Sequence, residues 1–297
     1  MEQQDLKLIF NAIESGKCLA FLGAGASTCY FDRKHEEVPG LPTGYKLAEL
    51  LANECSYSNG KVFDLPKVAD YFVYSENGDR EKLSRLIQRE IAAACKPRPI
   101  HTALAQLNKI KIIMTSNYDT LLEYEVHNYG RILTKHVYRR NGSQNALFQG
   151  TIFFEERDLI LHKMHGSIED PDSMIITQSD YIQYLLNLND PDRGMPEYFR
   201  KTIIPQFTLL FLGYSLEDWN FKVIWEGVLS RHHALGIHKI SYALLKNPSD
   251  FQISYWRDRK IKIINLDLTE FAIKLAGHFG LEIPQLGIEK KVEVTQP

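Results

Sequence analysis

The chain has 297 residues, enough for one large domain or two smaller ones around a substantial buried core. A formal net charge of −2 and a pI near 6.6 exclude a strong overall attraction to nucleic acid or to anionic membranes. No run approaches the roughly 18 apolar residues of a membrane span, and the four cysteines form no CxxC pair, so we expect a cytoplasmic protein with reduced thiols and without a zinc ribbon.

The predicted elements begin with an amphipathic helix over the first 17 residues. Six short apolar runs then predict strands, at residues 18–22, 111–114, 159–163, 208–212, 240–245 and 261–265. Most of these runs are continuous rather than alternating, which is typical of strands covered on both faces.

Helical patterns lie between or beside these strands. They cover residues 44–53, 81–94, 101–108, 119–128, 178–188, 217–231, 251–259 and 270–279. Strands that alternate with helices indicate parallel pairing and right-handed crossovers. We therefore expect an α/β fold with a Rossmann-like, doubly wound, mainly parallel six-stranded sheet.

The interval between the first two strands, about residues 28–110, is too long for one crossover and predicts a mostly helical insertion or lid. Residues 137–157 are expected to form a loop or hairpin, and about residues 285–297 a flexible tail. No internal repeat or low-complexity linker divides the chain. We interpret residues 1–297 as a single domain.

A glycine-rich stretch directly follows the first predicted strand. Glycines allow a tight turn and close approach of a ligand, and the helix start behind them offers N–H groups to a pyrophosphate. A third glycine at the usual dinucleotide spacing would fall at Thr28, and the Gly-Lys-Ser/Thr of a Walker loop is absent. A plain glycine turn remains the alternative. The residues are Gly23, Ala24, Gly25, Ala26 and Ser27.

Polar residues also follow the next three predicted strands. In doubly wound sheets, ligands bind outside the carboxyl ends of the strands. Because parallel strands end on the same side, we expect these residues to meet in one crevice beside the glycine-rich stretch. They are Thr115, Ser116, Asn117, Tyr118, Asp119, His165, Gly213, Tyr214, Ser215 and Asp218.

Three of these residues, His165, Asp119 and Asp218, have competing explanations, and for Asp218 the alternative is a helix cap. His162 and His165 form H-x-x-H, but positions three apart on a strand point to opposite faces, so we expect no metal ion. We interpret His165 as ligand-contacting or catalytic, with a structural role as the alternative. Asp119 also fits a helix cap, which is compatible with ligand contact. The amide of Asn117 can fix a hydroxyl or a water.

In this order, these stretches resemble motifs of the sirtuin (SIR2) family, and more closely those of its bacterial SIR2-like branch found in antiphage defence. Residues 23–27 are similar to the GAGxS nucleotide loop, and residues 115–119 to the T-x-N-x-D motif. His165 and Gly166 resemble the catalytic HG pair, and residues 211–215 with Asp218 resemble the late G-x-S segment. The resemblance spans roughly residues 18–266.

Two departures shape what the resemblance implies. Deacylating sirtuins carry two CxxC pairs and a GIPDFR stretch, and this chain has neither. The resemblance therefore implies hydrolysis of NAD to ADP-ribose and nicotinamide, with NAD as substrate and no metal. It implies catalytic roles for Asn117, Asp119 and His165, with His165 as general base, and NAD contacts for the other strand-end residues and the glycine-rich stretch.

Two other functions stay open: a sirtuin-like ADP-ribosyltransferase or deacylase, and a non-catalytic module that senses NAD. The resemblance also implies control by homo-oligomerisation or by a defence partner such as a HerA-like ATPase or a short Argonaute. The sequence itself indicates neither membrane association nor direct nucleic-acid binding.

Overall fold

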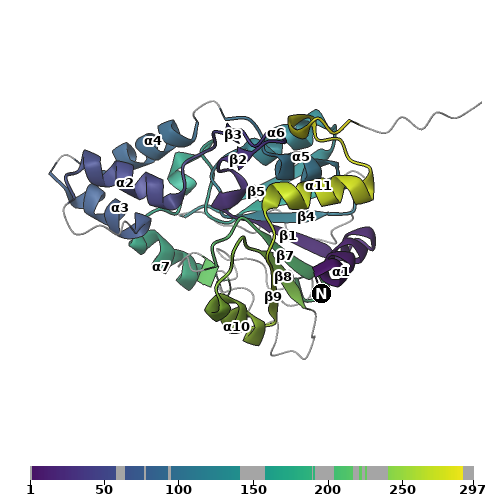
Figure 1. The fold of residues 1–297 in the computed structure, drawn as a ribbon. Helices are drawn as coiled ribbons and strands as arrows, with labels where there is room; N and C mark the ends of the chain where they lie inside the picture. The colour runs from purple at the N-terminus through teal and green to yellow at the C-terminus, as the bar shows by residue number, and fades with distance from the viewer. Residues whose placement is uncertain are drawn as a thin grey trace, which may run out of the picture.

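The computed structural model describes residues 2–57, 64–76, 78–92, 95–140, 158–188, 190, 204–216, 221–222, 225 and 240–289. A parallel sheet lies at the centre, in the strand order β5-β6-β4-β1-β7-β8-β9 (Figure 1). Its strands are β1 (Cys18–Leu22), β4 (Ile112–Thr115), β5 (Ile132–Val137), β6 (Asp158–Lys163), β7 (Thr208–Leu212), β8 (Ser241–Leu244) and β9 (Ile261–Ile264). Because β1 has β4 on one side and β7 on the other, the carboxyl ends of these three strands frame the switch point of the sheet.

The predicted Rossmann-like, mainly parallel sheet is confirmed, and the six predicted strands agree with the structure to within one or two residues. The sheet has a seventh strand, β5, at its edge, which the sequence did not predict. Thr134, Lys135 and His136 interrupt the apolar run there. An edge strand needs less apolar cover than a central one, so the continuous-run criterion missed it.

Helices cover both faces of the sheet (Figure 1). One face packs against α1 (Glu2–Glu14), α5 (Pro99–Gln106), α6 (Leu121–Asn128) and α11 (Leu268–Phe279). The other packs against α7 (Gln178–Asn187) and α10 (Asp250–Asp258). Strand β1 has all five side chains buried, as expected for a strand between two layers. Among the described helices, none combines the length and apolar character needed to cross a bilayer.

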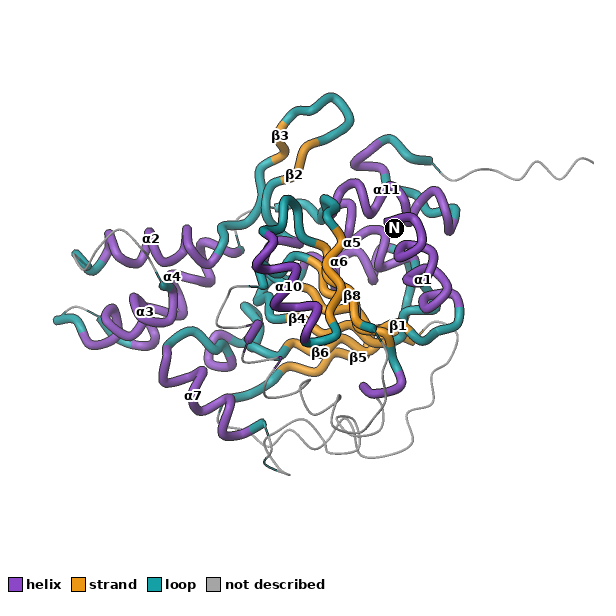
Figure 2. Tube along the Cα trace, turned by 60° about the horizontal axis from the view of Figure 1, so that its bottom comes forward, coloured by secondary structure: helices purple, strands orange, loops and turns teal. Residues whose placement is uncertain are grey.

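Between β1 and β4 lie a short antiparallel pair, β2 (Tyr30–Phe31) and β3 (Glu37–Val38), and three helices that pack on one another beside the sheet (Figure 2). The helices are α2 (Gly44–Glu54), α3 (Leu65–Tyr74) and α4 (Arg80–Ile91). The carboxylate of Asp180 in α7 holds this group of helices in place, because it pairs with Arg80 of α4 at 2.8 Å. The same carboxylate also pairs with Arg140, which follows β5, at 2.9 Å.

Several predicted segments lie outside the described residues. They are most of the helix at 217–231, residues 141–157 of the loop or hairpin, and residues 290–297 of the tail.

Candidate functional site

The turns that follow β1 and β7 interlock through their backbones. Gly23 N donates to the carbonyl of Leu212, and Gly25 N donates to that of Gly213, both at 2.9 Å. Gly213 has a φ of +78°, and a Cβ there would lie 2.3 Å from Ala26 N. Only glycine fits this position, so the predicted meeting of the first and fourth strand ends takes the form of direct backbone contact.

A cavity of about 920 Å³ opens beside these turns. The size falls within the range of small-molecule sites. Among its lining residues are six that the sequence predicted: Ala24, Gly25, Ala26, Gly213, Tyr214 and Ser215. Neither Asn117 nor His165 is among the described residues that line it.

The amide groups of the glycine-rich stretch are mostly engaged within the protein. Besides Gly23 and Gly25, Ala26 N donates to the Gly23 carbonyl at 2.9 Å and Ser27 N donates to the Ala24 carbonyl at 3.0 Å. We expected this stretch to offer free N–H groups to a pyrophosphate. In this structure most of these N–H groups donate to carbonyl groups of the protein. The small residues of the stretch still let a ligand come close to the backbone.

Asn117 joins the end of β4 to the glycine-rich stretch. Its Nδ2 donates to the Gly23 carbonyl at 3.0 Å and lies 3.2 Å from Ser27 Oγ. Its backbone N–H donates to Thr115 Oγ1 at 3.0 Å. The Oδ1 atom is buried and has no hydrogen-bond partner among the described residues. An acceptor held in place but left open can receive a hydrogen bond from a ligand hydroxyl or a water.

Asp119 both caps a helix and supports the glycine-rich stretch. Its Oδ1 accepts from Leu121 N at 3.1 Å, and its Oδ2 accepts from Ser27 Oγ at 2.8 Å. The capping role is therefore seen together with a contact to the glycine-rich stretch, and ligand contact by Asp119 stays a prediction. The fully buried Lys163 donates to the Asp119 carbonyl and pairs with Glu123 at 2.8 Å, which fixes the backbone here.

The remaining strand-end residues diverge. Ser116 Oγ lies 3.2 Å from the Tyr214 hydroxyl, which links the ends of β4 and β7. Tyr118 instead donates to the Ile175 carbonyl at 2.5 Å and packs within the cluster of α2, α3 and α4. Asp218 lies outside the described residues.

His165 is enclosed by two tyrosines of α7. Its ring meets those of Tyr181 and Tyr184 edge to face, with both centroid distances at 5.3 Å, and the residue is 1% exposed. Its Nε2 has no hydrogen-bond partner among the described residues. Burial lowers the pKa of His165 to about 3, so the ring is neutral at physiological pH and far less basic than a solvated imidazole.

The strand-alternation argument used to separate His162 from His165 does not hold. Strand β6 ends at Lys163, and a turn at Met164 and His165 breaks the alternation. The ring of His162 stacks on that of His136 at 4.7 Å. Burial, and then the charges of His136 and His165, lower the pKa of His162. In the described part of the chain, no three His, Cys, Asp or Glu side chains gather in a way that could hold a metal ion.

Sequence reasoning missed four charged residues that line the cavity: Asp64, Arg98, Lys246 and Asp267. Lys246 and Asp267 follow β8 and β9, so the strand-end rule would have found them if it had been applied to all six predicted strands. Arg98 precedes α5 and no pattern in the sequence marked it. Its side chain is brought to the cavity by packing against Tyr30 of β2.

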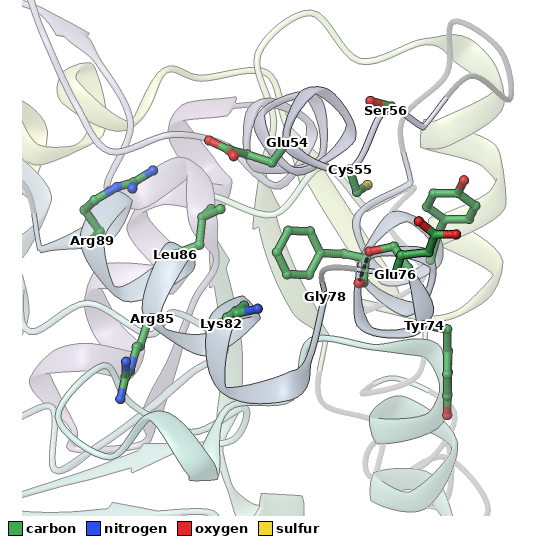
Figure 3. Close-up of a pocket in the computed structure, with 13 residues that line it drawn as sticks. Glu54, Cys55, Ser56, Tyr74, Glu76, Gly78, Lys82, Arg85, Leu86 and Arg89 are labelled. Carbon is green, nitrogen blue, oxygen red and sulfur yellow. Dashed lines mark hydrogen bonds between the residues drawn. The ribbon is translucent and has the colours of Figure 1, made fainter.

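A second cavity, of about 1070 Å³, lies between α2, α3 and α4 (Figure 3). Lys82, Arg85 and Arg89 of α4 contribute to its lining, together with Glu54 and Glu76. None of the predicted site residues lines it. The cavity at the sheet switch point is therefore the candidate site.

The burial of His165 predicts a loss of stability in acid. Because its pKa falls from 6.5 in the unfolded chain to about 3 in the folded one, the unfolded chain binds more protons between these values. The stabilising contribution is complete above about pH 6.5 and declines as the pH falls toward 3. We expect the urea midpoint of the parent to fall between about pH 7 and about pH 5, and that of His165→Phe to fall by less. His127→Phe, at an exposed site, should keep the parent's pH dependence; identical curves for all three would contradict the burial of His165.

Comparisons with known proteins relate the chain to SIR2-like proteins. Residues 111–264 match the model of the SIR2-like domain family. The chain is 28% identical over 277 residues to the NAD(+) hydrolase ThsA of Acinetobacter baumannii (strain 532279), covering 90% of this chain and 51% of that protein. It is 25% identical over 260 residues to the NAD(+) hydrolase ThsA of Bacillus cereus (strain MSX-D12), covering 86% and 49%.

A further relative is Defense-associated sirtuin 2 of Bacillus subtilis, 24% identical over 277 residues, with 88% of this chain and 24% of that protein covered. The chain thus spans about half the length of the two hydrolases and a smaller part of the third protein.

Proposed function

Because this chain belongs to the SIR2-like domain family, we propose that it is an NAD⁺ hydrolase that cleaves NAD⁺ to nicotinamide and ADP-ribose. The observation that carries the proposal is the state of Asn117. Its amide nitrogen ties β4 to the glycine-rich stretch, while its buried oxygen is left without a partner. An unsatisfied buried acceptor is costly, and a ribose hydroxyl or an attacking water would satisfy it. The names of the two hydrolase relatives add support.

The chemistry needs little proton transfer to the leaving group. Nicotinamide departs from a cationic glycosidic centre, so the site must mainly hold the substrate, stabilise an oxocarbenium-like ribose and admit water. We assign orientation of the ribose or of the water to Asn117. Asp119 supports it through Ser27, whose hydroxyl contacts both side chains. We assign the proton-accepting role to His165 Nε2, which belongs to a neutral ring and has no hydrogen-bond partner among the described residues.

We place the dinucleotide in the cavity beside the two glycine turns, with contacts from the residues of both turns that line it. We also assign NAD contacts to Thr115 and Ser116, which stand at the carboxyl end of β4. We further propose that NAD⁺ depletion serves antiphage defence, that residues 1–297 form one such catalytic domain, and that self-association or a defence partner controls it. The name of the defence-associated relative supports the first of these points.

The test is to incubate the purified protein with NAD⁺ labelled in its adenine ring and to measure nicotinamide, ADP-ribose and protein-bound label. Free ADP-ribose formed in step with nicotinamide is the expected result. Label on protein would support a transferase instead. Binding of NAD⁺ without nicotinamide release, both alone and with the product of a neighbouring gene, would support a sensing module.

A further inference from the structure

Arg98 carries a positive charge into the wall of the candidate cavity. The residue is only 3% exposed, yet it lines the cavity together with Pro99 and Ile100 at the start of α5. A buried charge is costly unless another charge or a full set of hydrogen bonds compensates it. The contacts of this guanidinium therefore show whether the protein itself supplies that compensation.

The described contacts of Arg98 are all with uncharged groups. Its Nη2 donates to the Pro39 carbonyl and to Cys95 Sγ, the latter at 2.8 Å, and its guanidinium lies 5.3 Å from the ring centre of Tyr30. Its Nε is buried and has no hydrogen-bond partner in the part of the chain that the structure describes. Among the described residues, Arg98 forms no salt bridge with a carboxylate, and the Asp119 carboxylate accepts from Ser27 and Leu121. The guanidinium is an incompletely satisfied cation.

The glycine-rich part of the same cavity lining leaves a bound pyrophosphate in need of a cation. Four amides of the glycine-rich stretch donate within the protein, so this turn provides room for a pyrophosphate but few hydrogen bonds to it. A guanidinium is the side chain best matched to phosphate oxygens, because it offers several donors in a fixed plane.

We infer that Arg98 is the residue that binds the pyrophosphate of the dinucleotide in the cavity that the glycine turns also line. The inference rests on the proposed function for the identity of the ligand, but it makes a separate statement about charge. A pyrophosphate removes the burial cost of Arg98 when it binds. Part of the free energy of pyrophosphate binding therefore comes from removing the unfavourable burial of the Arg98 charge in the free protein.

The test compares binding of ADP-ribose, which carries the pyrophosphate, with binding of adenosine, which carries none. For Arg98→Gln we expect the Kd for ADP-ribose to rise at least tenfold, and the Kd for adenosine to change less than twofold, in calorimetric titrations. Arg98→Lys should lie between parent and Gln variant. Arg257→Gln removes an exposed guanidinium on α10 and should match the parent.

Thermal unfolding without ligand separates this role from a structural one. If Arg98 serves only to anchor β2 and β3, Arg98→Gln lowers the Tm and leaves the Kd for ADP-ribose unchanged, and the inference falls. For Arg98→Gln we expect a Tm no lower than that of the parent, with a smaller rise in Tm on adding ADP-ribose.

If the Gln variant is too unstable to titrate, the Lys variant decides. Parent-like adenosine binding with weaker ADP-ribose binding supports the inference, and unchanged binding of both ligands overturns it. Arg98-dependent ADP-ribose binding without any NAD⁺ hydrolysis would sustain this inference while refuting the proposed function.

Discussion

Replacing Asn117 with alanine is expected to slow NAD⁺ hydrolysis by roughly 10³-fold, the upper range for removal of one preorganised polar group from an active site. The substitution removes both the open Oδ1 acceptor and the Nδ2 donor that holds the Gly23 carbonyl. Loss of one part-buried hydrogen-bonding side chain should lower the free energy of unfolding by only about 1–2 kcal/mol. Nicotinamide release, measured beside urea unfolding, separates the two effects.

Asn108→Ala is the matched control, because Asn108 is exposed on the turn before β4. It should retain parent activity and stability. Parent-like nicotinamide release by folded Asn117→Ala would remove Asn117 from the chemistry, and with it the main support for the proposed mechanism.

Replacing Gly213 with alanine is expected to lower the free energy of unfolding by about 3–5 kcal/mol and to abolish binding in the candidate cavity. The new Cβ would lie 2.3 Å from Ala26 N, and the backbone at φ +78° disfavours any side chain. The three atoms nearest to this Cβ, Ala26 N, Gly23 O and Gly25 C, all belong to the backbone of the glycine-rich stretch. This backbone is hydrogen-bonded to the Gly213 turn, so it cannot move away without breaking those bonds.

Gly277 offers the opposite case within α11, where a Cβ would meet nothing within 4 Å. Gly277→Ala should stabilise the protein by about 0.5–1 kcal/mol, because alanine loses less backbone entropy in a helix. Urea titrations of the two variants provide the comparison. A Gly213→Ala variant as stable as the parent would show that the two turns are not held against one another.

The central strands could be predicted because each is covered on both faces and therefore reads as an unbroken apolar run. β5 lies at the sheet edge, where Thr134 and Lys135 are tolerated, so the same criterion could not find it. The strand-end rule placed Asn117 beside Gly23 correctly, because parallel pairing alone brings the ends of β1 and β4 together.

Other properties of the site depend on packing between distant segments. The low pKa of His165 arises from the tyrosines of α7, and nothing in the local sequence indicates that they close over the ring. The engagement of the Gly25 amide depends on Gly213, and the position of Arg98 depends on Tyr30. Such contacts are set by tertiary structure, and local patterns do not encode them.

The interlocked glycine turns also determine when, during protein synthesis, the site can exist. The amides of Gly23 and Gly25 take their acceptors from Leu212 and Gly213, which the ribosome adds long after residues 23–27 have been made. A nascent chain that has not yet reached β7 lacks one half of the crevice. Contacts of such high sequence separation close late in folding. If the chain is the proposed NAD⁺ hydrolase, unfinished chains without β7 lack the activity, because one half of the crevice is missing.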